Sequence, residues 1–413
     1  MSDFILPLDI DSLDIISQSI DIKGNIVLTV ESKNDKTVCH KCGNDATKRY
    51  GYSGMIEVRH TSVFDKPVIL RIKPVRYECE QCDDHTTTTE KYSWLASGGK
   101  ITKGLEEYIL RCVINSTIQD VSRKEQISYS TVATVLHHKV GDSINWNNIT
   151  DLHTIGIDEI SNRKGHGHFI AIVSAKDKSG NLTILAVLDD RKKQTVLEFL
   201  SSIPDHLKKT VRSVCTDMYD GFVNAAIEVF GQQKVVVDRY HVAKLYRKPL
   251  DDLRIKEMAR LKSVLPADEY SKLKDMMWIL RKQHECLTQA DKDKLVLLYS
   301  YSPIMKKAHN YALQLTHIFN THCKRKSAIA KINRWITNVQ KSYLTCFDSF
   351  IETLEKYKVT IANYFKDRKN SGFVEGLNNK IKVVKRRCYG FTKTESLFQR
   401  LVMDLQGFRM LNL

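Results

Sequence analysis

The sequence predicts a multidomain α+β protein, and three of its features support this. Two Cys-x-x-Cys pairs lie among short alternating apolar segments in the amino-terminal quarter. Helical spacing of apolar residues begins near Ile101, and β-rich runs separated by glycine and polar turns begin near His153. At roughly 150 residues per domain, this length corresponds to two to four domains.

The composition favours a polyanionic partner and excludes a membrane protein. The 413 residues include 64 Lys and Arg against 48 Asp and Glu, which gives a formal net charge of +16. No run approaches the roughly 18 consecutive apolar residues of a membrane span, and the first residues carry Asp where a signal peptide needs basic side chains. Six isolated cysteines suit a reducing compartment. We therefore expect a cytoplasmic, nucleoid-associated protein with no membrane partner.

The first predicted domain, residues 1–97, is a zinc-binding β module. Alternating runs at 25–30 and 68–73 indicate strands, and the two Cys-x-x-Cys pairs have the spacing of a tetrahedral zinc knuckle. Redox chemistry or simple burial would not predict a second pair beside a β module. Four thiolates leave no open position on the metal, so the predicted Zn²⁺ is structural. Its predicted ligands are Cys39, Cys42, Cys79 and Cys82.

The second predicted domain, residues 98–150, is a helix-turn-helix. One helix is expected to end near Gln126, and Ser128 or Ser130 is placed to cap the next. Tyr129, Ser130 and Thr131 would then face base edges or phosphates. Any two short helices joined by a polar turn would give a similar pattern, but its position after a zinc module in a basic chain favours DNA binding.

The remaining sequence predicts a mixed sheet interrupted by helices. From residue 151 the expected order is β-β-β-α-β-α-β, which favours antiparallel hairpins followed by right-handed crossovers. Long Lys, Leu and Glu-rich stretches with helical spacing follow. The expected domains are 151–241 (first part of the sheet domain), 242–361 (all-helical insertion) and 362–413 (final helix and basic tail).

Three carboxylates are candidate catalytic residues. Asp158 is expected at the end of a strand, on the face opposite Ile155 and Ile157, and Asp217 ends the fourth strand of this region in the same way. If these strands are neighbours, the two carboxylates converge at one edge of the sheet. Glu375 is expected on the last helix, where spacing at 100° per residue places it on one face with Lys382 and Arg386.

Converging carboxylates need a counter-charge, which two Mg²⁺ or Mn²⁺ ions would supply. Such a pair of ions promotes phosphodiester displacement by activating the attacking oxygen and stabilising the leaving oxygen. Lys382 and Arg386 would then bind DNA phosphates beside the site. The alternative is that each acid caps a helix or pairs with a neighbouring lysine.

Four segments resemble signatures of the ISL3 family of insertion-sequence transposases. They are Gly156-Ile-Asp-Glu159, Thr216-Asp-Met-Tyr219, Asp238-Arg-Tyr-His-Val242 and Glu375-Gly-Leu-Asn-Asn-Lys-Ile-Lys382. The resemblance implies an RNase H-like catalytic fold in which Asp158, Asp217 and Glu375 form a metal-binding DDE triad. Asp238 and His241 become possible accessory residues.

The expected function is that of a DNA transposase. It would bind the terminal inverted repeats of its own element, hydrolyse the phosphodiester at each end and join the exposed 3′-OH to target DNA. Pairing two ends implies a homodimer or a higher oligomer on double-stranded DNA. The alternative is a DNA-binding regulator, a domesticated transposase in which the zinc and helix-turn-helix modules remain active and the acids are structural.

Overall fold

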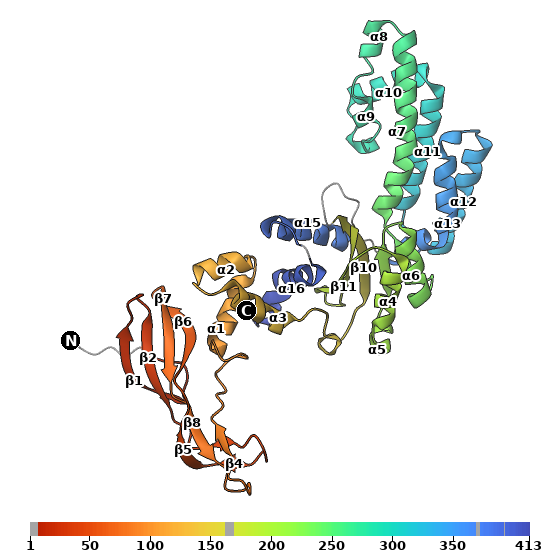
Figure 1. Ribbon diagram of the computed structural model, residues 1–413. Helices are drawn as coiled ribbons and strands as arrows, with labels where there is room; N and C mark the ends of the chain where they lie inside the picture. Colours follow the sequence, from red (N-terminus) through yellow and green to blue (C-terminus); the bar gives the residue numbers. More distant parts are fainter. Residues whose placement is uncertain (1–6, 162–168, 369–371, 392) are drawn as a thin grey trace. The chain divides into compact units, whose positions relative to one another are not determined.

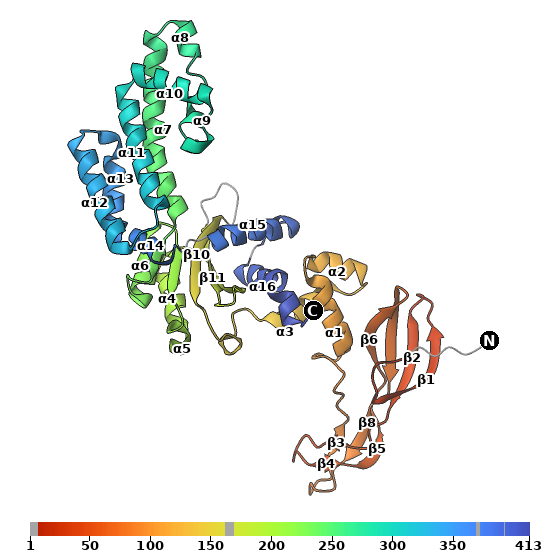
Figure 2. The same cartoon turned by 180° about the vertical axis from the view of Figure 1, so that it is seen from behind.

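The computed structural model describes residues 7–161, 169–368, 372–391 and 393–413 (Figures 1 and 2). It confirms a mixed α+β protein with several sheets. The chain forms two compact units, which are described separately. The first unit comprises residues 1–142, 387–390 and 399–413, and the second comprises residues 143–386 and 391–398.

The first unit begins with a four-stranded sheet of order β1-β2-β7-β6. Strands β2 and β7 pair in parallel and the two outer pairs are antiparallel. Alternate residues of β2, β6 and β7, among them Leu28, Val58 and Leu70, are buried in a common core, as period-two alternation predicts. The strands are β1 (Leu13–Ile20), β2 (Ile26–Ser32), β6 (Ile56–Val63) and β7 (Lys66–Ile72).

A smaller β region carries the two cysteine pairs. It contains the two-stranded sheet β3-β4 and the three-stranded sheet β5-β8-β9. Tyr77 is buried among the cysteines, and its hydroxyl donates a hydrogen bond to the carbonyl of Asn34 (2.8 Å). The strands are β3 (Thr37–Val38), β4 (Asp45–Ala46), β5 (Lys48–Tyr52), β8 (Val75–Glu78) and β9 (Thr87–Thr89).

Three helices and the carboxyl-terminal half of α16 (Thr394–Met410) complete the first unit. Met403 is buried in the core formed by α1 (Lys103–Val113), α2 (Ile118–Lys124) and α3 (Tyr129–Val140). A Cβ at Gly407 would lie 2.8 Å from Ile114, so the glycine permits this close approach. Residues 399–410, in the segment 362–413 that was expected to form a final helix and basic tail, are therefore part of a helical core.

A buried ion pair holds α16 against the turn between α1 and α2. The Asp404 carboxylate accepts hydrogen bonds from Arg400 (3.0 Å), from Arg387 and from the Asn115 N–H (3.0 Å). Arg400 also donates to the carbonyl groups of Val113 and Ser116. Because both partners of the pair are almost fully buried, each needs the other to offset its loss of hydration.

Replacing Asp404 should therefore destabilise the first unit. In Asp404→Ala the buried Arg400 guanidinium loses its counter-charge, and we expect the free energy of unfolding to fall by about 3–5 kcal/mol. Chemical denaturation of the full chain measures this value. Glu395→Ala, at an exposed position of the same helix, is the matched control and should change it by less than about 0.5 kcal/mol. A decrease of less than about 1 kcal/mol for Asp404→Ala would contradict the proposed role of the pair.

The second unit is built on a five-stranded sheet of order β12-β11-β10-β13-β14. The first three strands are antiparallel and the last two join in parallel, so the expected mixed sheet is confirmed. The strand β10 extends beyond Asp158 to Ser161, because it pairs with β11 along its whole length. The strands are β10 (Thr154–Ser161), β11 (Phe169–Lys176), β12 (Leu182–Leu188), β13 (Ser213–Thr216) and β14 (Val235–Val237).

Helices cover both faces of this sheet (Figure 1). Ile155 and Ile157 share a core with residues of α4 (Lys193–Ser202) and α6 (Asp220–Phe230). On the opposite face, a Cβ at Gly156 would collide with side chains of α15 (Gly372–Arg387). Strand alternation places Asp158 on this second face, as predicted. The short elements η1 (Trp146–Asn148) and α5 (Asp205–Lys208) complete this part.

The expected all-helical block follows β14 and packs as one core with the sheet. Its buried aromatic residues include Trp335, which contacts Tyr311, Phe347 and Phe350 edge-on. The helices are α7 (Arg239–Val264), α8 (Ala267–Ser271), α9 (Met276–Ile279), η2 (His284–Cys286), α10 (Gln289–Tyr301), α11 (Pro303–Asn320), α12 (Arg325–Lys341), η3 (Thr345–Phe347), α13 (Asp348–Ala362) and α14 (Tyr364–Asp367). Among the described residues, no helix has the length and apolar character needed to cross a membrane.

Candidate active site and metal centre

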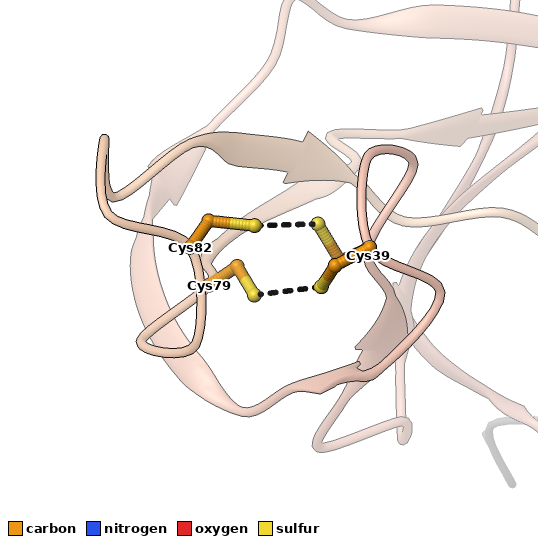
Figure 3. Close-up of side chains that lie close together, drawn as sticks. Cys39, Cys79 and Cys82 are labelled. Atoms are coloured by element: carbon orange, nitrogen blue, oxygen red, sulfur yellow. Dashed lines mark hydrogen bonds between the residues drawn. The ribbon is translucent and has the colours of Figure 1, made fainter.

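The four predicted zinc ligands come together in the first unit (Figure 3). The Sγ atoms of Cys39 and Cys82 are 3.9 Å apart, those of Cys42 and Cys79 are 3.5 Å apart, and all four lie within 4.8 Å of one another. Tetrahedral zinc with Zn–S bonds of about 2.3 Å places its sulfur ligands about 3.8 Å apart. The cluster therefore fits a structural Zn²⁺ ion.

The knuckle backbone favours the thiolate form that binds metal. The N–H of Lys41 donates to Cys39 Sγ (3.4 Å), and hydrogen bonds from the backbone of Cys42 and Lys41 lower the pKa of Cys39 to about 6. The adjacent thiol of Cys42, together with burial, raises the pKa of Cys82 to about 12. Four thiols at this separation cannot all ionise without a cation between them.

The histidines near this module do not join the cluster. His40 bonds through its ring to the Thr88 hydroxyl (2.8 Å), and the ring of His60 bonds to the Thr102 hydroxyl (2.9 Å). The sequence favours a surface position for His60, but the structure leaves only 7% of it exposed, because it fills the space between β6 and the start of α1. The sequence predicts a hairpin turn at His166 and His168, and both residues lie outside the described part of the chain.

Asp158 and Asp217 occupy equivalent places on neighbouring strands. Strands β10 and β13 are parallel neighbours, and Ile157 is the register partner of Thr216. The residues that follow Ile157 and Thr216 are Asp158 and Asp217. The two strands are neighbours, as convergence of these carboxylates requires. The Asp158 carboxylate accepts hydrogen bonds from the Glu159 N–H (2.7 Å) and the Asn378 amide (2.5 Å), and Asp217 accepts one from the Tyr219 N–H (2.9 Å).

Both aspartates are held in an environment that disfavours their negative charge. Burial raises the pKa of the Asp158 carboxyl above its usual value, although its two hydrogen-bond donors offset part of the effect. Burial also raises the pKa of Asp217, and the charge of Asp158 adds to this increase. Two carboxylates that oppose each other's ionisation form a suitable site for a divalent cation.

The raised pKa of Asp217 predicts that Asp217→Asn increases the stability of the folded protein. A carboxyl whose pKa is raised by folding destabilises the folded state above its unfolded pKa, about 4, and this cost disappears as the pH falls below that value. Without divalent ions, the variant should therefore melt at a higher temperature than the parent protein at pH 7, and the difference should shrink towards pH 4. Asp252→Asn, an exposed acid on α7, should melt like the parent. A lower melting temperature for Asp217→Asn would contradict this account.

Glu375 lies on a helix that runs along β10. Phe373 and Val374 meet the strand at Gly156, Asn378 bonds to Asp158, and Lys385 Nζ donates to the carbonyl of Ser161 (2.7 Å). The eleven helical steps from Val374 to Lys385 and the five strand steps from Gly156 to Ser161 both span roughly 16 Å. The helix and the strand can therefore contact each other at both ends of this segment. Glu375 therefore lies between the contacts to Gly156 and Asp158.

The carboxylate of Glu375 does not complete a metal cluster in this structure. Within the described part of the chain, the four cysteines are the group of His, Cys, Asp and Glu side chains that comes close enough to hold an ion. Glu375 is exposed. The amide of Asn378, one turn further along α15, donates a hydrogen bond to the Asp158 carboxylate instead. No sequence signal placed Asn378 beside Asp158, because the two residues are 220 positions apart.

The accessory candidates lie beside the two aspartates. Asp238 follows β14 and caps α7 by accepting a hydrogen bond from the Tyr240 N–H (3.1 Å). His241 Nδ1 is 3.7 Å from the Asp238 carboxylate, and the charge of His241 lowers the pKa values of Asp158 and Asp217 against the effect of burial. His241 is therefore within electrostatic reach of the candidate site.

Arg191 is a residue of the site that no sequence pattern predicted. Its guanidinium pairs with Glu159 (2.5 Å) and stacks over the rings of Phe169 and Tyr219. Strand alternation predicts that Glu159 lies on the face opposite Asp158 as a supporting or surface acid, and the ion pair with Arg191 accounts for it. An arginine following a strand by three residues carries no distinguishing pattern, so only the fold could place it here.

The predicted DNA-contacting residues are on accessible surfaces. Ser128 caps α3 by accepting a hydrogen bond from the Thr131 N–H (3.1 Å). This leaves Tyr129 53% exposed on the first turn, followed by Ser130 and Thr131. On α15, Lys382 and Arg386 are exposed together with Glu375, while Val374, Leu377, Ile381 and Val384 are buried.

Comparison with known proteins supports the resemblance seen in the sequence. The transposase family designated DDE ISL3 matches residues 155–401. The transposase for insertion sequence element IS1001 of Bordetella parapertussis is 24% identical over 379 residues, covering 90% of this chain and 89% of that protein. The transposase for IS1557 of Mycobacterium tuberculosis is 22% identical over 391 residues, covering 90% and 86%.

Proposed function

The chain belongs to the ISL3 family of transposases, and we propose that it moves its own insertion sequence by a DDE mechanism. The observation that carries this proposal is the pair of half-buried aspartates on neighbouring parallel strands, with Asp158 inside β10 and Asp217 directly after β13. The mixed five-stranded sheet with helices on both faces supports an RNase H-like assignment. A general DNA-binding role would not require two carboxylates in a site that disfavours their charge.

The proposed reaction has two displacements at phosphorus. A water oxygen first attacks the phosphodiester at each element end, and the 3′-oxygen leaves as a hydroxyl. That hydroxyl then attacks a target phosphodiester, which exchanges one P–O bond for another. When bound, Mg²⁺ or Mn²⁺ ions activate the attacking oxygen and neutralise the leaving oxygen.

The chain's own residues position the ions and the DNA. Asp158 and Asp217 offer the hard oxygen ligands that Mg²⁺ prefers, and we propose Glu375 as the third acid because α15 holds it alongside β10. This requires the Asn378 amide to release Asp158 when ions bind. Lys382 and Arg386, on the same exposed face as Glu375, would hold the DNA backbone.

Recognition of the element ends would fall to the first unit. We propose that Tyr129, Ser130 and Thr131 read the terminal inverted repeats from the first turn of α3 and that the zinc module adds a second contact. The excess of basic residues would supply salt-sensitive backbone binding. A homodimer or higher oligomer would bring the two element ends together.

One assay tests the proposal. The purified full chain is incubated with Mg²⁺ or Mn²⁺, a labelled terminal repeat and a target plasmid. We expect nicking at the element end and then joined products. Repeat-specific binding with neither nicking nor joining would favour the regulator, and cutting without joining would favour a general nuclease.

A further inference from the structure

The helical block contains a pocket that the proposed chemistry does not use. It has a volume of about 250 Å³ and is lined by residues of α7, α11 and the segment that begins in α9. Leu250, Leu280 and Ala312 give it an apolar floor, and Tyr246 adds an aromatic side chain. A pocket with an apolar floor can accept a flat apolar group.

The rim of this pocket carries an excess of positive charge. Arg254 and Arg281 both pair with Asp251, at 2.8 and 3.0 Å, so one carboxylate serves two guanidinium groups. Arg247 also lines the pocket, is exposed and makes no ion pair with any described residue. Burial lowers the pKa of His309 to about 4, so this residue of the wall is neutral at pH 7. With Lys282 and Glu285 included, the lining has four cationic side chains against two carboxylates, which favours an anionic ligand.

An exposed tryptophan stands beside this rim. Trp278 is 60% exposed on α9, whereas its neighbours Met276 and Ile279 are buried. The guanidinium of Arg281, which lines the pocket, lies 6.0 Å from the centre of the Trp278 ring. From the sequence, core packing is the expected role of both tryptophans of the block, Trp278 and Trp335. That is correct for Trp335, which is 2% exposed, and wrong for Trp278, because the short helix α9 buries only its other face.

Helix α7 connects the pocket to the candidate active site. It begins at Arg239, directly after Asp238, and its residues Arg247 and Arg254 line the pocket. At about 1.5 Å per residue these arginines lie roughly 14 and 24 Å along the helix from Asp238. The pocket is therefore within reach of a DNA strand that continues from the site.

We propose that Trp278 and this pocket bind an unpaired segment of a single DNA strand. A base stacks on the exposed indole, the pocket floor accepts a neighbouring base, and Arg247 and Arg281 bind the phosphates between them. An aromatic platform beside guanidinium groups is the combination that binds single strands without reading their sequence. The inference rests on the proposed function, because cleavage at an element end would release such a strand.

The test is binding of a labelled oligothymidylate of about ten nucleotides to the full chain. Trp278→Ala removes one stacking contact, so we expect it to weaken oligothymidylate binding by about 5- to 150-fold. Binding of a duplex of equal length should stay unchanged. Oligothymidylate should also quench tryptophan fluorescence in the parent protein and not in Trp278→Phe. The matched control is Tyr343→Ala, which removes a 91% exposed aromatic side chain elsewhere in the helical block. It should bind like the parent.

Three results would overturn the inference. Trp278→Ala could bind oligothymidylate as tightly as the parent, or it could lose duplex and single-strand binding equally. Third, Arg247→Glu could abolish oligothymidylate binding while Trp278→Ala does not, and inorganic phosphate could displace the oligonucleotide. That result would assign the pocket to a small anion. Nicking of the terminal repeat is measured separately, so an inactive protein that still binds single strands through Trp278 would refute the proposed function and leave this inference intact.

Discussion

Asp158→Asn is expected to abolish nicking and joining while leaving binding of the terminal repeat unchanged. The substitution keeps the size of the side chain but removes the charge that would bind a divalent cation. Metal-based stabilisation of the transition state is worth several kcal/mol, and a loss of about 4 kcal/mol corresponds to a rate decrease of roughly 10³-fold. Single-turnover nicking of a labelled terminal repeat measures the rate, and a gel shift of the same DNA measures binding.

Asp189→Asn is the matched control for this experiment. Asp189 also follows a strand of the same sheet, but it lies beyond the edge strand β12 and accepts a hydrogen bond from the Thr394 hydroxyl (2.6 Å), which an asparagine can also accept. We expect nicking within about twofold of the parent rate, which corresponds to less than about 0.5 kcal/mol. If Asp158→Asn nicks DNA as fast as Asp189→Asn, the acids of β10 and β13 are not catalytic.

The two aspartates were predictable because their placement follows from local rules. Alternation along Thr154–Ser161 determines which face carries Asp158, and a short β-rich run followed by Asp217 is visible in the sequence. The cysteine cluster was predictable for a similar reason, since a Cys-x-x-Cys turn constrains both of its thiolates. In each case the spacing of residues within one segment was enough.

Contacts between distant segments were not predictable in the same way. Gly156 suggested that some group approaches the strand closely, but nothing in the sequence identified Phe373 and Val374 of α15 as that group. The pairing of Asn378 with Asp158 spans 220 positions, and the burial of Arg400 against the α1–α2 turn spans more than 280. Such contacts depend on tertiary packing, which periodicity does not encode.

Loss of zinc is expected to have the largest effect on DNA recognition. Cys79 is fully buried and its Sγ lies 3.5 Å from that of Cys42, so Cys79→Ser removes one of four converging ligands and leaves a buried hydroxyl in its place. Structural zinc contributes about 10–16 kcal/mol of apparent binding free energy in zinc-finger peptides, which is comparable to the whole stability of a typical domain. We expect the two small sheets β3-β4 and β5-β8-β9 to unfold and repeat-specific affinity to fall by at least about 10³-fold, to the non-specific level.

The comparison with an isolated cysteine decides whether this effect comes from the metal cluster. Cys286→Ser changes an exposed thiol in the second unit and should keep both the zinc content and the affinity for the repeat. A strong chelator should reproduce the Cys79→Ser phenotype in the parent protein, and added Zn²⁺ should reverse it. Because the second unit has its own core, its unfolding transition should persist in Cys79→Ser. Full repeat-specific binding by a zinc-free parent protein would show that the four thiols hold the module together without a metal.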